Sequence, residues 1–257
     1  MKTFNKLIFK LIFILILLGI IISLIGFFTG YSYYSKALKE KPLLERVSSY
    51  TESENFVKYE NLPQNYINAV ISIEDHRYFE HGPIDPIGIA RALFNNVSTG
   101  VFDEGGSTIT QQVAKNIVFS QEQTIARKLG EVLAAYELEK NYSKKDIFAI
   151  YVNSAYFGDG YYGIYDASYG YFKKAPKDLS LDEASMLAGI PNAPSIYAPT
   201  VNPDLANQRQ KQVLNRMIEC EYITENDTDL IEINLLLHKG IIFLIIYNPF
   251  FIFLYIL

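Results

Sequence analysis

Cysteine, tryptophan and histidine are scarce in this sequence, and each shortage excludes a class of site. The 257 residues include one cysteine, Cys220, and no tryptophan. A single cysteine rules out an internal disulfide, a multi-cysteine zinc site and a paired redox motif. The three histidines, at positions 76, 81 and 238, lack the HExxH-like spacing of a zinc hydrolase. The sequence therefore predicts no certain metal site.

Positive charge is scarce beyond the N-terminal segment. Residues 1–46 carry seven basic and two acidic side chains, net +5, whereas the remainder carries 16 and 26, net −10. An acidic body without a basic stretch is a poor nucleic-acid binder, so nucleic acid is not an expected partner. Charged residues at 20% and aromatic residues at 14% exclude global disorder. The length allows one medium-sized domain with appendages.

One long apolar run lies near the N-terminus. No charged side chain occurs in residues 11–35, and residues 11–28 are almost wholly Leu, Ile and Phe. Roughly 20 apolar residues span a bilayer as a helix. A cleaved signal peptide is the alternative, but the run is long for one and no small-x-small site follows it. A short basic start favours a cytoplasmic N-terminus. We therefore predict a cytoplasmic start at 1–10, a transmembrane anchor at 11–33 and a body outside the cytoplasm.

The rest of the chain shows mainly helical patterns. Residues 34–60 are polar, contain Pro42 and are expected to form a stalk. We find no convincing set of alternating strands, so we predict an all-α domain over 61–220. The predicted helices run from Pro63 to Gly82-Pro83, from Asp85-Pro86 onward, over 108–119 with Ser107 as N-cap, and over 124–141, 144–153 and 181–189.

Two adjacent carboxylates, Glu74 and Asp75, lie in an apolar helical stretch close to Arg77 and His81. The helix dipole disfavours negative charge at a C-terminus. A carboxylate there, among apolar neighbours, tends to have a raised pKa, as a general base needs. The alternative is that Glu74 only pairs with Arg77 on a solvated face.

A second segment combines two glycines with a polar helix face. Glycines at 105–106 let the backbone approach a ligand, and the following helix N-terminus offers N–H groups to an anion. The pattern predicts a phosphate or pyrophosphate cradle, although an ordinary capped amphipathic helix explains it equally well. It is not a P-loop, because the GxxxxGK[ST] order is absent. The polar face consists of Thr108, Gln111, Gln112 and Lys115.

In a third segment, Arg127 and Glu131 stand one helical turn apart. They could form only a surface pair, worth about 0.3 kcal/mol. The helix is also apolar on both sides, which would bury Glu131 and leave a buried carboxylate that needs a reason. The apolar stripe predicted for this helix consists of Ile125, Leu129, Val132 and Tyr136.

The order of these segments resembles the peptidoglycan glycosyltransferases, glycosyltransferase family 51. Glu-Asp-His-Arg-Tyr-Phe-Glu-His at 74–81 precedes Gly-Gly-Ser-Thr-Ile-Thr-Gln-Gln at 105–112 and Arg-Lys-x-x-Glu at 127–131. Residues 153–174 and 181–199 also match, so the resemblance covers roughly residues 60–218. The family includes monofunctional enzymes and the N-terminal domains of class A penicillin-binding proteins. It implies a mostly α fold, with a lysozyme-like helical lobe and a small membrane-associated jaw near residues 84–103.

The resemblance also implies a reaction. Lipid II, an undecaprenyl-pyrophosphate disaccharide-pentapeptide, would be polymerised into β-1,4 glycan with inversion and release of undecaprenyl pyrophosphate. Glu74 would be the general base for the acceptor hydroxyl, and Lys115 would stabilise pyrophosphate charge. Glu131 would support the leaving group through a cation or a divalent metal, or orient the basic residues. No cofactor is required, although Mg²⁺ or Mn²⁺ could take part.

The predicted site and partners follow from that resemblance. The enzyme would be a single-pass protein of the bacterial cell membrane with its catalytic domain on the outer side. Its partners would be lipid II, the growing glycan and the membrane, and could include other cell-wall synthesis and division proteins. The predicted catalytic residues are Glu74 and Glu131, and the predicted substrate-binding residues are Asp75, Arg91, Ser107, Thr108, Gln111, Gln112, Lys115, Arg127, Lys128 and Asn153.

Several positions depart from the family pattern. Gln123 stands where an arginine is common and Lys173 where a glycine is common. The acidic residue that usually precedes an alanine pair is replaced around Tyr165 to Ser168. The tail, residues 221–257, ends in an apolar run that contains Pro249. It is either a second membrane segment or, as we favour, a product of out-of-frame translation. No SxxK or KTG motif follows, so the chain is expected to be monofunctional or the front of a bifunctional protein.

Two other functions fit parts of the pattern. A lysozyme-like hydrolase or lytic transglycosylase would also use a glutamate on a helical lobe, but a phosphate cradle at 105–115 is useless to an enzyme that sees no phosphate. A membrane-anchored scaffold would explain the changes at Gln123 and Lys173 as decay. The presence of Glu74, Lys115 and Glu131 argues against that scaffold.

Overall fold

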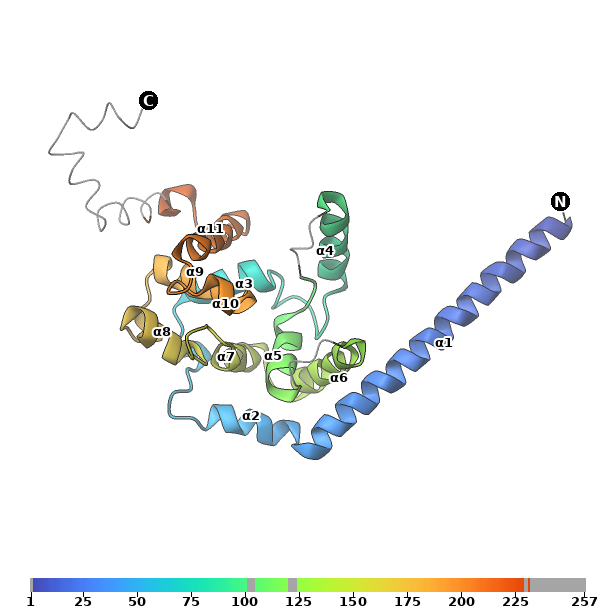
Figure 1. Ribbon diagram of the computed structural model, residues 1–257, viewed down its shortest axis with the longest axis horizontal. Coiled ribbons are helices and arrows are strands. Elements are labelled where there is room, and N and C mark those ends of the chain that lie inside the picture. Colours follow the sequence, from blue (N-terminus) through green and yellow to red (C-terminus); the bar gives the residue numbers. More distant parts are fainter. Residues whose placement is uncertain (1, 101–104, 120–123, 229–230, 232–257) are drawn as a thin grey trace, which may run out of the picture. The chain divides into compact units, whose positions relative to one another are not determined.

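The computed structural model describes residues 2–100, 105–119, 124–228 and 231 (Figure 1). Their only β-type pairing is an isolated antiparallel bridge between Tyr156 and Tyr162, so the all-α prediction is confirmed for this part of the chain. Gln123 and the predicted apolar tail lie outside the described residues. The helices are α1 (Lys2–Glu40), α2 (Leu43–Thr51), α3 (Gln64–Glu74), α4 (Pro86–Thr99), α5 (Ile109–Val118), α6 (Ile125–Asn141), α7 (Lys144–Ser154), α8 (Ile164–Phe172), α9 (Leu181–Gly189), α10 (Pro194–Tyr197) and α11 (Pro203–Glu219), with short 3-10 turns at Tyr59–Asn61, Pro176–Asp178 and Ile190–Asn192.

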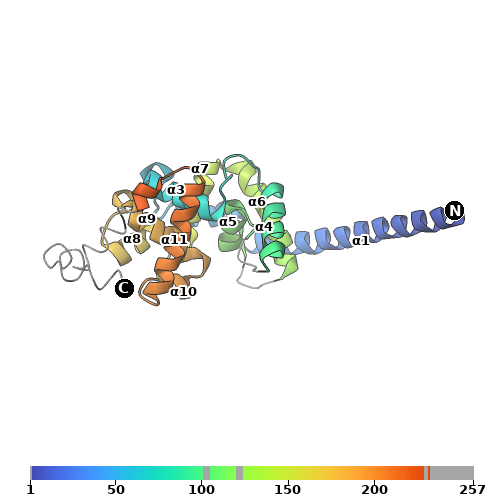
Figure 2. The ribbon, with the colours of Figure 1, turned by 90° about the horizontal axis from the view of Figure 1, so that it is seen from above.

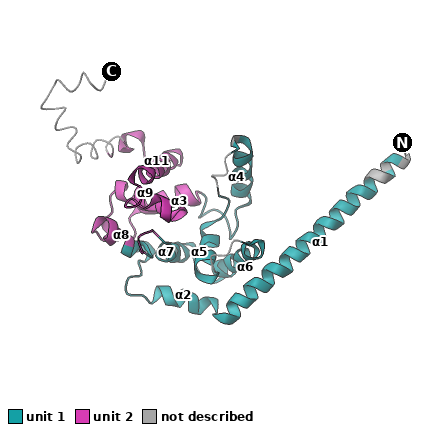
Figure 3. Ribbon diagram, viewed as in Figure 1, with its two compact units in different colours: residues 1–61, 77–156, 162–166 teal, residues 62–76, 157–161, 167–257 magenta. Residues whose placement is uncertain are grey.

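The chain divides into two compact units, shown in different colours in Figure 3. Unit 1 comprises residues 1–61, 77–156 and 162–166, and unit 2 comprises residues 62–76, 157–161 and 167–257. Each unit has its own buried apolar core.

Helix α1 of unit 1 is long and apolar enough to cross a membrane, as predicted. It is a single helix of 39 residues that contains the predicted anchor and runs beyond it to Glu40. Its apolar side chains between residues 11 and 28 are exposed, and both views show its N-terminal half projecting from the other helices of unit 1 (Figure 2).

The segment 34–60, expected to be a stalk, is largely helical and packs into unit 1. Leu43 and Val47 of α2 are buried. The Arg46 guanidinium donates hydrogen bonds to the carbonyls of Ala37 (2.9 Å) and Lys41 (2.8 Å), at the end of α1 and just beyond it, and of Ile117 (3.1 Å) in α5. The polar composition of this segment concealed the two buried side chains and the arginine that joins α1 and α2 to α5.

Helix α5 lies at the centre of unit 1, against α2, α6 and α7. The apolar residues Ile109, Val113 and Ile117, which recur every four positions, are all buried. A capping box between Ser143 and Asp146 fixes the start of α7 at Lys144. The helices predicted at 108–119 and 144–153 are therefore both present, within one residue at each end.

The apolar stripe predicted for α6 is wrong. Ile125 is 82% exposed and Tyr136 is 52% exposed. The face that α6 buries consists instead of Gly130, Glu131, Ala134, Ala135 and Leu138. Both sides of this helix carry apolar residues, so periodicity alone did not select the buried side. Small residues at 130, 134 and 135 allow close packing, which decides the orientation.

Unit 2 is built around α3, which packs against α9 and α11. Helix α9 matches the predicted helix at 181–189 and begins at a capping box between Ser180 and Glu183. Helix α3 ends at Glu74 and not at Gly82-Pro83, because Asp75 adopts an extended backbone, φ −163°. Helix α11 was not predicted; its N-cap, Asn202, accepts a hydrogen bond from the Leu205 N–H.

Candidate functional site

The N-terminus of α5, in unit 1, is organised by a capping box. Thr108, and not the predicted Ser107, is the N-cap: its hydroxyl accepts from the Gln111 N–H (3.1 Å), and the Gln111 side chain accepts from the Thr108 N–H (2.9 Å). Both side chains are buried. The Thr108 hydroxyl also donates to the Pro83 carbonyl at 2.8 Å. Thr108 and Gln111, predicted to bind substrate, thus serve the helix cap.

Gly106, which precedes this cap, allows a close approach of backbone to α4. A Cβ at Gly106 would lie 3.3 Å from the Cα and the Cγ1 of Ile89, which is tighter than an ordinary contact. On the opposite side of the cap, Ser107 is only half-buried. Its hydroxyl therefore remains available to side chains of α6.

Four residues from α6 and the α5 N-terminus form one polar cluster, which we call the Glu131 cluster: Ser107, Arg127, Lys128 and Glu131. The Lys128 Nζ donates to the Ser107 hydroxyl at 2.6 Å and lies 3.0 Å from Glu131 Oε2. Arg127 pairs with the other oxygen, Oε1, of Glu131. Glu131 is 1% exposed, so the prediction that it is buried is confirmed. Its burial is compensated by a cation on each oxygen.

The Glu131 cluster is suited to an anion. Two cationic side chains share one carboxylate, which leaves one positive charge in excess beside the N-terminus of α5. A helix N-terminus itself favours negative charge. The buried Nε of Arg127 has no hydrogen-bond partner among the described residues. A buried donor in that condition is unusual in a native structure and is consistent with a ligand that accepts from it.

The other polar residues predicted in unit 1 lie on α4 and α5. Gln112 and Lys115 are half-buried on α5, one and two turns beyond the cap. Arg91 is half-buried on α4. Helix α4 otherwise exposes a row of large apolar side chains, namely Ile87, Ile89, Leu93, Phe94 and Val97.

The side chain of Asn153, predicted to bind substrate, is engaged in hydrogen bonds within unit 1. Its Oδ1 accepts from the Val57 N–H (2.9 Å), and its Nδ2 donates to the carbonyls of Val57 (2.8 Å) and Ala149 (2.8 Å). Both amide hydrogens are therefore in use. The side chain holds the segment that precedes α3 against α7. The backbone of Gly163 lies close to Asn153: a Cβ at position 163 would lie 2.9 Å from the Asn153 carbonyl oxygen.

Glu74 and Asp75 belong to unit 2, at the C-terminus of α3. Glu74 is half-buried and Asp75 is buried, and the Asp75 N–H closes the helix on the Ile71 carbonyl at 3.0 Å. Burial, and then the negative charge of Glu74, raise the pKa of the Tyr66 hydroxyl. The Glu74 carboxylate is thus at the end of an apolar helix, near a phenol that stays neutral.

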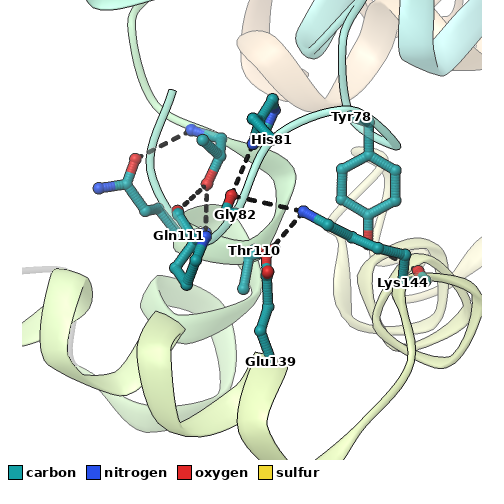
Figure 4. A network of polar contacts seen from close by, with 9 residues as sticks. Tyr78, His81, Gly82, Thr110, Gln111, Glu139 and Lys144 are labelled. Atoms are coloured by element: carbon teal, nitrogen blue, oxygen red, sulfur yellow. Dashed lines mark hydrogen bonds and ion pairs between the residues drawn. The ribbon is translucent and has the colours of Figure 1, made fainter. Parts of the chain in front are cut away.

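The loop that joins α3 to α4 is held in unit 1 by a network that the sequence did not indicate (Figure 4). Lys144 Nζ pairs with Glu139 at 2.7 Å, donates to the Gly82 carbonyl at 3.4 Å and lies 4.5 Å from the centre of the Tyr78 ring. The Thr110 hydroxyl donates to Glu139 at 2.7 Å. These contacts join α5, α6 and α7 to residues 78–82. Apart from the Lys144–Glu139 pair, they link residues far apart in the sequence, which left no local signal.

Comparison with known proteins places these helices in a family. Residues 40–218 match the family model described as Transglycosylase. The chain belongs to the transglycosylase family. It is 48% identical to penicillin-binding protein 1A of Neisseria gonorrhoeae over 174 residues, which are 68% of this chain and 22% of that protein. It is 42% identical to penicillin-binding protein 1F of Bacillus subtilis over 183 residues, 71% of this chain and 26% of that protein.

The match confirms the family resemblance predicted from the motifs, and this transglycosylase spans about a quarter of the length of the curated relatives it matches. The family region begins at residue 40, inside the segment expected to be a stalk. One predicted departure has a structural correlate. Lys173, where a glycine is common, has φ +57°, a left-handed conformation that favours glycine. The backbone at this position thus has a glycine-type conformation with a lysine in it.

Proposed function

We propose that this transglycosylase polymerises lipid II into β-1,4-linked glycan with inversion and releases undecaprenyl pyrophosphate. The observation that carries the proposal is the Glu131 cluster, which presents an excess positive charge and a free buried donor at a helix N-terminus. A pyrophosphate leaving group needs such a site, because its negative charge grows as the glycosidic bond to it breaks.

The general base is Glu74. Its carboxylate takes the proton from the 4-hydroxyl of the acceptor GlcNAc as that oxygen attacks the anomeric carbon of the donor MurNAc. The bond from the anomeric carbon to the pyrophosphate oxygen breaks, and its electron pair leaves with the pyrophosphate. Attack opposite the leaving group converts an α-linked donor into a β-linked product. The end of an apolar helix, described for Glu74, suits a carboxylate that must accept a proton.

Charge on the leaving group is balanced by Arg127 and Lys128, with Lys115 and Arg91 as further cations for the donor phosphates. Ser107 and Gln112 contact the same phosphates, and Asp75 supports the acceptor. Glu131 acts by orienting the two basic side chains, since each of its oxygens already has a cationic partner. For the same reason we do not propose Glu131 as a ligand of Mg²⁺ or Mn²⁺, and activity is expected to persist in a chelator.

The membrane is proposed as a partner because the substrate is lipid-linked. Helix α1 holds the enzyme at the bilayer, and the exposed apolar side chains of α4, such as Leu93 and Phe94, form the jaw that contacts lipid. We propose that the folded domain is on the outer side of the cytoplasmic membrane, where other cell-wall synthesis and division proteins could bind it.

The test is polymerisation of labelled lipid II by the detergent-solubilised chain, with and without EDTA. Glycan ladders are expected from the wild type in both conditions. The substitution Glu74→Gln should abolish them, whereas Glu80→Gln, at an exposed glutamate, should leave them unchanged. Glu131→Gln should reduce the rate through loss of the arrangement of Arg127 and Lys128.

Three results would contradict the proposal in different ways. Bound lipid II without polymer from the wild type would indicate a scaffold. Shortening of preformed glycan would indicate a hydrolase. Ladders from Glu74→Gln equal to those of the wild type would leave polymerisation standing and remove Glu74 as its base.

A further inference from the structure

Helix α1 is joined to α6 by a set of close contacts beyond its role as an anchor. A Cβ at Gly30 would lie 2.5 Å from the Leu129 Cβ, and a Cβ at Gly130 would lie 3.5 Å from the Gly30 carbonyl oxygen. The Tyr34 hydroxyl donates to the Glu137 carboxylate. We call this set of contacts the α1–α6 joint. It brings the two helices together over about two turns of each, with glycine where the backbones meet.

The joint also fixes the relative direction of the two helices. A Cβ at Gly26 would lie 3.4 Å from the Leu129 side chain. Further along α1, Gly30 contacts Leu129 and Gly130, and Tyr34 contacts Glu137. Higher numbers on α1 pair with higher numbers on α6, so the helices run side by side in the same direction. The first turn of α6 therefore extends back along α1, toward the apolar run.

The apolar run sets a depth for this turn. Residues 11–28 of α1 rise about 27 Å, which matches the hydrocarbon core of a bilayer of about 30 Å. Gly26 and Gly30 then lie at the boundary of the bilayer that faces the folded domain. Leu129 lies at the same level, and Ile125, one turn earlier on a parallel helix, lies about 6 Å deeper. Ile125 is 82% exposed.

We infer that the α1–α6 joint holds the first turn of α6 inside the lipid bilayer, with Ile125 in the acyl-chain region. The inference rests on the proposed membrane location and goes beyond it, because it assigns a lipid-facing role to a helix that also carries the Glu131 cluster. It accounts for two residues of the predicted apolar stripe of α6: Leu129 faces the anchor helix and Ile125 faces lipid.

One consequence concerns the Glu131 cluster. Arg127 and Lys128 lie between Ile125 and Leu129, at the boundary where lipid phosphates are found. Long basic side chains reach polar groups from such a depth, and Lys128 is 47% exposed there. A lipid-linked pyrophosphate would meet these cations without leaving the plane of its own membrane.

The test measures depth with a fluorophore. Cys220→Ser removes the native cysteine, and Leu18→Cys, Ile125→Cys and Tyr136→Cys each take one environment-sensitive label in the full chain. The chains are reconstituted into vesicles of phosphatidylcholine and phosphatidylglycerol that contain a lipid with a nitroxide high on its acyl chain. The label at 125 should be quenched at least about twofold more than that at 136, because the two positions lie about 16 Å apart along α6.

Helix α1 offers a matched pair of variants for the joint. Gly30→Leu places a side chain in the Leu129 contact and should abolish quenching at 125, whereas Gly19→Leu, where nothing lies within 4 Å, should preserve it. If Gly30→Leu does not fold, Tyr34→Phe, which removes only the hydroxyl bound to Glu137, should reduce the quenching.

The label at Leu18 separates this inference from the membrane location. Quenching at 18 but not at 125 would overturn the inference and leave the anchor in place. A blue-shifted label at 125 that lipid nitroxides do not quench would mean that protein covers this turn, which also overturns it. Absence of quenching at both positions would remove the proposed membrane location itself.

Discussion

Replacement of Lys173 by glycine should stabilise this protein. Lys173 follows the end of α8 with φ +57°, a conformation that costs an L-residue roughly 1–2 kcal/mol. Glycine removes that cost but loses about 0.4–1 kcal/mol through the larger entropy of its unfolded chain. The hydrogen bond from Lys173 Nζ to the Gly170 carbonyl, 3.0 Å, is exposed and contributes little. The net gain is therefore about 0–1.6 kcal/mol, with a middle value of about 0.8 kcal/mol.

The assay is thermal unfolding of the detergent-solubilised chain. For a domain of this size, 1 kcal/mol corresponds to roughly 2–4 °C, so Lys173→Gly should raise Tm by about 1–4 °C. Lys173→Ala is the decisive control, since it removes the same charge and long chain but keeps the Cβ that causes the strain. It should give no increase. Equal increases for glycine and alanine would refute the backbone argument and point to charge or side-chain effects.

Two further predictions concern unit 2 and the turn at Asn153. Partial burial acts to raise the pKa of Glu183, but hydrogen bonds from Lys174 and from Ser180 lower it more, so the net shift is downward. The stability that Glu183 contributes is present above its ordinary pKa near 4.5 and is lost as the pH falls through the lower pKa of the folded state. Glu183→Gln should therefore flatten the dependence of the free energy of unfolding on pH in this range. An unchanged slope of that dependence would contradict the assignment. Gly163→Ala, with φ +85° and a Cβ 2.9 Å from the Asn153 carbonyl, should cost at least about 1 kcal/mol in urea unfolding, and a stable variant would show that this turn can shift.

The helices that the sequence predicted well are those with local signals. Helix α9 has both an N-cap serine and a glutamate three residues later, so its start was readable from four residues. At α5 the same kind of signal was displaced by one position: Ser107 and Thr108 are both good caps, and only Gln111, three residues after Thr108, identifies the second as the one used. The burial of Glu131 was also predictable, because α6 carries apolar residues on both sides.

The errors share a physical cause, which is dependence on distant residues. The role of Asn153 is set by Val57, 96 positions earlier, and no spacing rule connects them. The contact between α6 and α1 likewise depends on a distant residue, since Leu129 needs a glycine at position 30 to fit. The motifs identified the family correctly, but they did not indicate that Thr108 and Gln111 build the cap of α5.

The contacts of α1 with Phe119 and Leu129 also bear on how the folded domain can be produced without its membrane span. Tyr33 packs its ring 5.6 Å from that of Phe119, a residue that is otherwise buried. A chain started after Glu40 would lose the membrane span and, with it, the cover over Phe119 and Leu129. Detergent would then still be needed to mask the uncovered surface. A chain that starts at Gly26 would keep this cover and lack most of the apolar run of α1.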